Sequence, residues 1–190
     1  MVVAVLPAGC SGDDGADPTT TSAATPSAPD TAPGPTVPSS AELVTIACAD
    51  GLAVSDAGPL PTDLTSVSGL AASRLQDGVV WAVEDSFEPA DLVALGTDGR
   101  ELGRVRVQGG PLANLDWEDL AITDGPDGVP QVYVADIGDN LSVRPSVQLY
   151  VFDEPSPDDD SADPRVIQAT YEDLTGRTVR PNAEALVVQD

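Results

Sequence analysis

The sequence contains no histidine and no lysine, and the absence of histidine excludes a class of chemistry. All 8 basic residues are arginines. Without histidine, the chain has neither the usual general base of serine and cysteine hydrolases nor the commonest zinc ligand. A metal site in this chain must therefore be built from oxygen atoms, which favours Ca²⁺ or Mg²⁺ over zinc, copper or iron.

Positive charge and aromatic side chains are also scarce. The 8 arginines face 32 acidic residues, which gives a formal net charge of −24, and aromatic residues make up 4% of the chain. Such a surface repels phosphate backbones, so we expect no nucleic-acid partner, whereas it attracts divalent cations. No stretch approaches the roughly 18 apolar residues of a transmembrane helix.

The first ten residues resemble a bacterial lipoprotein signal. Val2–Leu6 is apolar, and the string Leu6-Pro-Ala-Gly-Cys10 is similar to a lipobox, in which the cysteine becomes the lipid-carrying first residue of the mature protein. Nine residues with no basic residue are short for a secretory signal, so we expect the true translation start to lie upstream. We interpret residues 1–10 as a signal remnant with lipidation at Cys10; the alternative is an apolar N-terminus with an ordinary cysteine.

Residues 11–40 have the composition of a disordered linker. They contain six Pro, six Thr, five Ser and five Ala, with no aromatic residue. This segment cannot bury enough apolar surface to offset the entropy of ordering. A lipid at Cys10 followed by a flexible tether predicts an extracytoplasmic protein anchored to the membrane by that lipid. Cys48 then either pairs with a cysteine outside this sequence or is a small buried strand residue.

Residues 41–190 carry a repeated phrase. Val67–Ser73 is followed after a short turn by Val79–Ser86; Trp117–Thr123 is followed in the same way by Gln131–Asn140; Asn182–Val188 begins the phrase again. Short apolar runs alternate with turn signals such as Asp98-Gly99, which predicts antiparallel hairpins. The strands we predict are Leu43–Cys48, Val67–Ala72, Val79–Glu84, Asp91–Leu95, Glu101–Val107, Leu115–Ile122, Gln131–Asp136, Val147–Phe152, Arg165–Tyr171 and Glu184–Val188.

This spacing predicts an all-β chain of the β-propeller class. Four strands between Val67 and Val107 form the first blade, and four between Leu115 and Tyr171 form the second, with an acidic surface insertion at 158–163. Glu184–Val188 is predicted to start an incomplete third blade, so residues 41–190 are a partial propeller. A β-sandwich of short strands is the alternative.

The most specific strings in the repeats resemble a family of secreted bacterial propellers. They are Asp116-Trp-Glu-Asp119, Asp136-Ile-Gly-Asp-Asn140 and Asn182-Ala-Glu-Ala-Leu186. Members are variously described as phytase-like, esterase-like or lipoproteins of unknown role. The resemblance implies a propeller longer than this sequence, and it carries no activity with it.

The acidic strings provide candidate metal ligands. Aligning the three phrases places Ser68, Glu118 and Glu184 at one level of the innermost strands. Carboxylates facing a central channel suit a hard cation such as Ca²⁺, with Asp116 and Asn182 as further ligands. The alternative for Glu118 and Glu184 is ordinary axial hydrogen bonding.

A second acidic group follows the second strand of each repeat. Asp136, Asp139 and Asn140 in one repeat match Glu84, Asp85 and Ser86 in the other. We interpret the Asp136–Asn140 string chiefly as turn chemistry, with positive φ at Gly138; a cation-binding rim is the other reading.

Two functions remain open from the sequence. The first is a non-catalytic binding or scaffolding module with an unknown protein or small-molecule ligand, because no nucleophile–base pair is visible. The alternative is a Ca²⁺-dependent phosphoesterase of phytase-like type, in which cations offset the acidic cleft.

Overall fold

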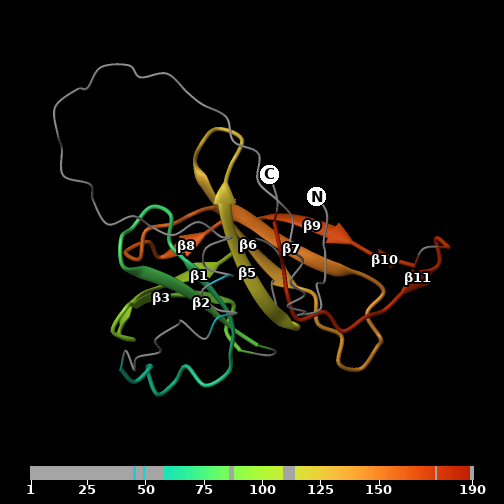
Figure 1. Cartoon of the computed structure of the whole chain (residues 1–190), viewed down its shortest axis with the longest axis horizontal. Helices are drawn as coiled ribbons and strands as arrows, with labels where there is room; N and C mark the ends of the chain where they lie inside the picture. Colours follow the sequence, from blue (N-terminus) through green and yellow to red (C-terminus); the bar gives the residue numbers. More distant parts are fainter. Residues whose placement is uncertain are drawn as a thin grey trace. The chain divides into compact units, whose positions relative to one another are not determined.

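A computed structural model describes Thr45, Ala49 and residues 58–188, apart from 86–87, 109–113 and 174. Its regular elements are all strands (Figure 1). The signal remnant at 1–10, the linker at 11–40 and both cysteines lie outside the described residues, as does the predicted strand Leu43–Cys48 apart from Thr45. No helix among the described residues has the length and apolar character needed to cross a membrane.

The first sheet is an antiparallel meander of the first four strands. These are β1 (Val67–Ala72), β2 (Val79–Glu84), β3 (Asp91–Gly96) and β4 (Glu101–Val107), in the order β1-β2-β3-β4. The predicted turn between β3 and β4 is confirmed: Gly99 has a φ of 80°, a conformation that glycine adopts without steric cost. The observed strands match the predicted bounds within one residue.

The second sheet repeats this arrangement. Its strands are β5 (Trp117–Asp124), β6 (Pro130–Asp136), β7 (Val147–Asp153) and β9 (Arg165–Ala169), again paired antiparallel in chain order. The predicted strand Arg165–Tyr171 ends earlier than expected, at Ala169. Beyond it, β10 (Tyr171–Glu172) pairs with β11 (Thr178–Val179) in a small hairpin.

Two short strands were not predicted: β11, and a strand in the acidic insertion. β8 (Ser161–Ala162) lies in the acidic insertion between β7 and β9, and it pairs in parallel with β4, at the outer edge of the first sheet. The amide of Gln108 donates to the carbonyl of Ala162 at 2.7 Å. The insertion therefore connects the two sheets by backbone hydrogen bonds rather than lying freely on the surface.

The two sheets share a register in detail. β1 is bulged between Val67 and Gly69, and β5 is bulged between Trp117 and Asp119. The bulges place Ser68 and Glu118 at equivalent positions, as the aligned phrases predict. A bulge re-aims side chains, so both strands turn the same position out of the regular pleat.

The main core lies between the sheets. Trp81 and Leu92 of the first sheet belong to one buried cluster with Trp117 and Tyr150 of the second, and the rings of Trp117 and Tyr150 lie 5.8 Å apart. The backbones of the two sheets approach closely at Gly69, where an added Cβ atom would lie 2.8 Å from the Cα of Asp119. Burial of these large side chains is the principal stabilising term.

The predicted strand Glu184–Val188 is absent, because residues 181–188 form no ladder in the structure. The physical reason lies in the repeat itself. The first strand of each sheet pairs only with the second strand of its own sheet, and no such partner for 184–188 exists among the described residues. The segment is nevertheless held in place, since Ala183 and Leu186 are buried in a cluster with Ile137 and Leu149.

Candidate functional site

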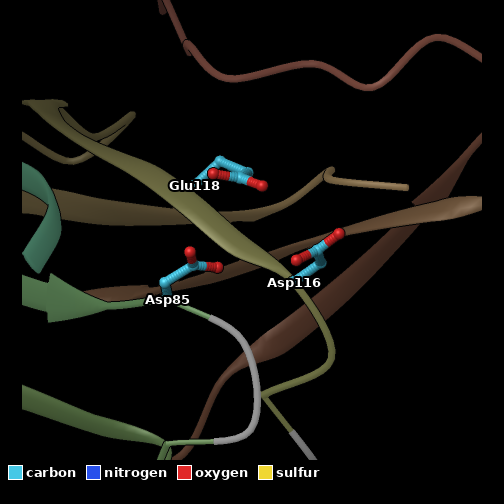
Figure 2. Close-up of side chains that lie close together, drawn as sticks. All are labelled: Asp85, Asp116 and Glu118. Carbon is cyan, nitrogen blue, oxygen red and sulfur yellow. The ribbon is translucent and has the colours of Figure 1, made fainter. Parts of the chain in front are cut away.

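Three acidic side chains meet between the two sheets. Asp85 follows β2, Asp116 precedes β5 and Glu118 lies within β5, and one carboxylate oxygen from each lies within 4.8 Å of the others. Figure 2 shows the three side chains around a common space. Asp116 and Glu118 were predicted as ligands, whereas Asp85 was assigned only to a rim. The arrangement brings two predicted ligands together and adds a third.

A buried asparagine positions this group. The side-chain amide of Asn114 donates to the carbonyl oxygens of Glu84 and Asp85 at 2.8 and 2.7 Å, and its Oδ1 accepts from the amide of Trp117 at 3.1 Å. Asn114 thus ties the end of β2 to the start of β5. Because the end of one strand and the start of the other are fixed together, Asp85 and Asp116 are held side by side.

Glu184, the third predicted ligand, lies next to Glu118. The carboxyl group of Glu184 is near enough to act on that of Glu118, and its Oε1 accepts from Asn182 at 2.5 Å. Glu184 is exposed, whereas Glu118 is 5% exposed. Glu184 therefore borders the group from the solvent side, and the predicted neighbourhood of Glu118 and Glu184 is present in the structure.

The electrostatics of Glu118 follow from this crowding. The pKa of Glu118 is raised to about 8, chiefly by burial and further by a side-chain hydrogen bond and the charge of Glu184 and by the charges of Asp85 and Asp116. A carboxyl group whose charged form is both desolvated and surrounded by like charges retains its proton near neutral pH. The buried charge of such a carboxyl group can be offset in two ways: by a shared proton, or by a divalent cation bound in place of that proton.

Gly138 closes the site from a third side. A Cβ atom at this position would lie 2.3 Å from the Oε1 of Glu118 and 2.4 Å from the Oδ2 of Asp116. The predicted positive φ at Gly138 is wrong, since Gly138 is not among the positive-φ glycines, whereas Ser142 in the same loop has a φ of 53°. Glycine is required here by the closeness of the carboxylates and not by a left-handed backbone.

Two polar residues of the 136–140 string have hydrogen-bond partners. The Oδ1 of Asp139 accepts from the amides of Val143 and Arg144 at 2.8 and 3.1 Å. Asn140 donates from its side chain to Asp116 at 3.4 Å. The interpretation of Asp139 as a turn residue is thus supported, while Asn140 borders the acidic group.

Asp136 is paired with Arg144 in the interior. Arg144 donates to the Oδ1 of Asp136 at 2.6 Å and to the carbonyl of Gly138 at 2.8 Å. Burial raises the pKa of Asp136, against the lowering effect of Arg144. Arg144 therefore holds this loop in place.

Several polar and aromatic residues outside the acidic group have structural roles. The hydroxyl of Ser68, aligned with Glu118, donates to the carbonyl of Trp117 at 2.7 Å and joins β1 to β5. Trp81 is fully buried and Tyr133 is half-buried, and both pack in the core clusters. Arg177 pairs with Asp173 at 3.3 Å.

Comparisons with known proteins were made at three levels. No family model, no curated protein and no solved structure matches the chain. The chemistry of the site thus rests on its own geometry: three carboxylates from two sheets, with Glu184, Asn140 and Asn182 around them.

Proposed function

We propose that residues 58–188 belong to a β-propeller that acts as a binding or scaffolding module at the cell envelope. The observation that carries this proposal is a proximity found at two equivalent positions. A Cβ atom added at Gly69 of β1 would lie 2.8 Å from the amide nitrogen of Leu120, and the side chain at the equivalent position in β5, Asp119, accepts from the amide of Leu186 at 2.8 Å. The first repeat is therefore related to the second as the second is to the 182–188 segment, and repetition of one such relation generates the ring of a propeller.

The packing faces support the same relation. Strand registers equate Trp81, Leu92 and Val105 of the first sheet with Tyr133, Leu149 and Ile167 of the second. The first three belong to the core that the second sheet covers, and the last three belong to, or pack against, the cluster that contains Ala183 and Leu186. A sandwich of two sheets gives no reason for the outer face of the second sheet to repeat the inner face of the first.

The relation between repeats can be tested at one hydrogen bond. Asp119→Ala removes the acceptor of the Leu186 amide, so hydrogen exchange at Leu186 should accelerate by about 10-fold. Asp124→Ala, a change at the exposed end of the same strand, is the matched control and should leave Leu186 unchanged. Equal exchange rates in the two variants would count against the repeated relation.

A binding role is favoured over catalysis by the chemistry present. The sequence has no histidine, and Ser68, at the level of the acidic group, has its hydroxyl engaged with the Trp117 carbonyl. The carboxylates offer recognition of cations or cationic groups, and they hold no nucleophile–base pair. The ligand class that suits this site is a hard cation or a positively charged group.

The location proposed for this module is outside the cytoplasm, anchored by a lipid at Cys10 through the linker at 11–40. The apolar Val2–Leu6 string and the Pro/Thr/Ser composition support it. Cys10→Ala should abolish membrane partitioning and incorporation of a labelled fatty acid. Unchanged partitioning, or a polar in-frame sequence upstream, would contradict the lipid anchor, whereas the proposal of a binding module would stand.

The second candidate is a Ca²⁺-dependent phosphoesterase, favoured by the convergence of Asp85, Asp116 and Glu118. Bound cations would offset the acidic charge and polarise a phosphate ester. Calcium titration with thermal melting tests the cation: Glu118→Gln and Glu184→Gln should each abolish a Ca²⁺-induced rise in Tm. Phosphate release from phytate or a model ester tests the enzyme, and release that needs Ca²⁺ and falls in both variants would replace the binding role.

A further inference from the structure

An apolar groove of about 200 Å³ lies on the face of the second sheet that is turned away from the first. Its walls include Val147, Leu149, Ala169 and Leu186. Apart from Thr170 and Glu172, its lining is apolar or aromatic, so its chemistry is that of a packing site rather than of the acidic group.

The same walls exist on the first sheet, where they are covered. By strand register and phrase alignment, the four wall residues correspond to Ala90, Leu92, Val107 and Leu120. Those four lie in the core between the sheets together with Trp117 and Tyr150, whose rings lie 5.8 Å apart. At the first interface, the second sheet supplies both of these aromatic rings.

One substitution distinguishes the two interfaces. The phrase alignment of Asp116-Trp-Glu-Asp-Leu120 with Asn182-Ala-Glu-Ala-Leu186 places Ala183 at the position of Trp117. Ala183 and Leu186 are buried against the second sheet, as Trp117 and Leu120 are buried against the first. The indole ring of the first interface therefore has no counterpart in the 182–188 segment.

We propose that this groove is the acceptor for a tryptophan- or tyrosine-sized aromatic side chain, presented by a β-sheet that packs on the second sheet as the second packs on the first. This rests on the repeat relation of the proposed function and specifies its next contact. The argument for the occupant is positional: the equivalent walls already hold Trp117 and Tyr150, and residues 182–188 have Ala183 at the Trp117 position, so a covering sheet has to supply the aromatic ring from another strand. Aromatic rings in such sites contribute both area and ring-edge contacts.

Indole is the probe for this acceptor, used with the 190-residue chain. Titration with indole should give saturable methyl NMR shifts at Val147, Leu149 and Leu186. Ala183→Trp fills the groove from within, so it should abolish these shifts and raise Tm by roughly 4 °C. Ala72→Trp, the same change at an exposed position of β1, is the matched control and should leave indole binding intact.

The outcomes separate this proposal from the repeat relation. Indole that shifts none of the three methyl groups, or shifts them equally in a folded Ala183→Trp variant, overturns the acceptor. If Ala183→Trp does not fold, Ala183→Phe carries the same test, and the titration of the unsubstituted chain stands by itself. Failure of the repeat relation appears elsewhere, as a Leu186 amide whose exchange ignores Asp119→Ala.

Discussion

The two sheets share one register and use their matched positions differently. At the end of the second strand, Glu84 of the first sheet accepts from the amides of Thr65 and Ser66 at 2.8 and 3.2 Å. Its equivalent, Asp136, accepts from the amide of Asp116 at 3.1 Å and also pairs with Arg144. Glu84 binds only the loop before β1, whereas Asp136 binds the residue before β5 and, through Arg144, also fixes the loop after β6.

The bulges show a similar division. The first sheet has Ser68 and Gly69 there, so that β5 can approach closely, while the second sheet has Glu118 and Asp119. The framework is therefore repeated, and the carboxylates are an addition to the second repeat. Because the framework is shared and the local chemistry is not, a substitution in one sheet can be compared with a substitution at the equivalent position of the other.

The largest difference is expected at the buried acids. Asp136→Ala leaves Arg144, whose side chain is 13% exposed, without its carboxylate partner, and the free energy of unfolding should fall by about 3–5 kcal/mol. Glu84→Ala in the first sheet leaves two amides unpaired and should cost about 1–3 kcal/mol. Urea denaturation followed by tryptophan fluorescence measures both. Equal losses would mean that the two acids do the same work.

The next difference concerns pH. The pKa of Glu118 is raised from 4.5 to about 8, so the folded chain holds a proton that the unfolded chain releases in this range. Stability should therefore fall as pH rises from about 4.5 to about 8. Glu118→Gln should raise Tm at pH 8 in the presence of a chelator and leave it unchanged near pH 4.

The matched variant for this test is Ser68→Ala, the same bulge position in the first sheet. It should leave the slope of Tm against pH as in the unsubstituted chain, because no carboxylate is involved. A slope that survives Glu118→Gln would assign the effect to other acids.

The close approach of β1 and β5 gives a smaller effect. In Gly69→Ala, the new Cβ would meet the backbone of Asp119 and Leu120 at 2.8 Å, so the sheets must separate, at a cost of about 1–3 kcal/mol. Asp119→Ala at the matched position of β5 loses one hydrogen bond to the 182–188 segment and should cost about 1 kcal/mol. Thermal melting ranks the two, and a neutral Gly69→Ala would show that the strands are farther apart in solution.

The smallest effect is expected at an exposed link between the sheets. Arg74 and Asp124 form a salt bridge of 3.1 Å with both side chains about half exposed, so Asp124→Asn should change stability by less than about 0.5 kcal/mol. The buried link nearby is Glu154, which accepts from Trp81 Nε1 at 2.9 Å. Glu154→Gln should cost more than Asp124→Asn in the same denaturation series; the reverse order would contradict the burial argument.

The sequence pattern predicted most of the two sheets because strand alternation and Asp-Gly turns are local signals. It also predicted that Asp116, Glu118 and Glu184 would be neighbours, since a repeat aligns equivalent positions. The strand at 161–162 could not be found, because its partner β4 is more than fifty residues away and only two residues pair. Asp85 was assigned to the rim and not to the ligand group, because its connection to β5 runs through Asn114, a long-range side-chain contact.

Gly138 illustrates the limit of local reasoning. A glycine in an acidic turn suggests a left-handed backbone, yet what excludes a side chain here is a pair of carboxylates from another strand. The predicted strand 184–188 is wrong for a related reason. A β-strand needs a hydrogen-bonded neighbouring strand, and the described residues provide none for this segment.

The pairing of β8 with β4 has a consequence for synthesis on the ribosome. The first four strands of the first sheet are complete at Val107, but the outer edge of β4 at Arg106 and Val107 pairs with Ser161 and Ala162 of β8. During translation, that edge stays open until a further fifty or so residues have emerged, and an open edge recruits other strands. The first sheet is thus completed only after β8 has been synthesised: a pause between β4 and β8 lengthens the interval in which nascent chains associate, and a faster passage shortens it.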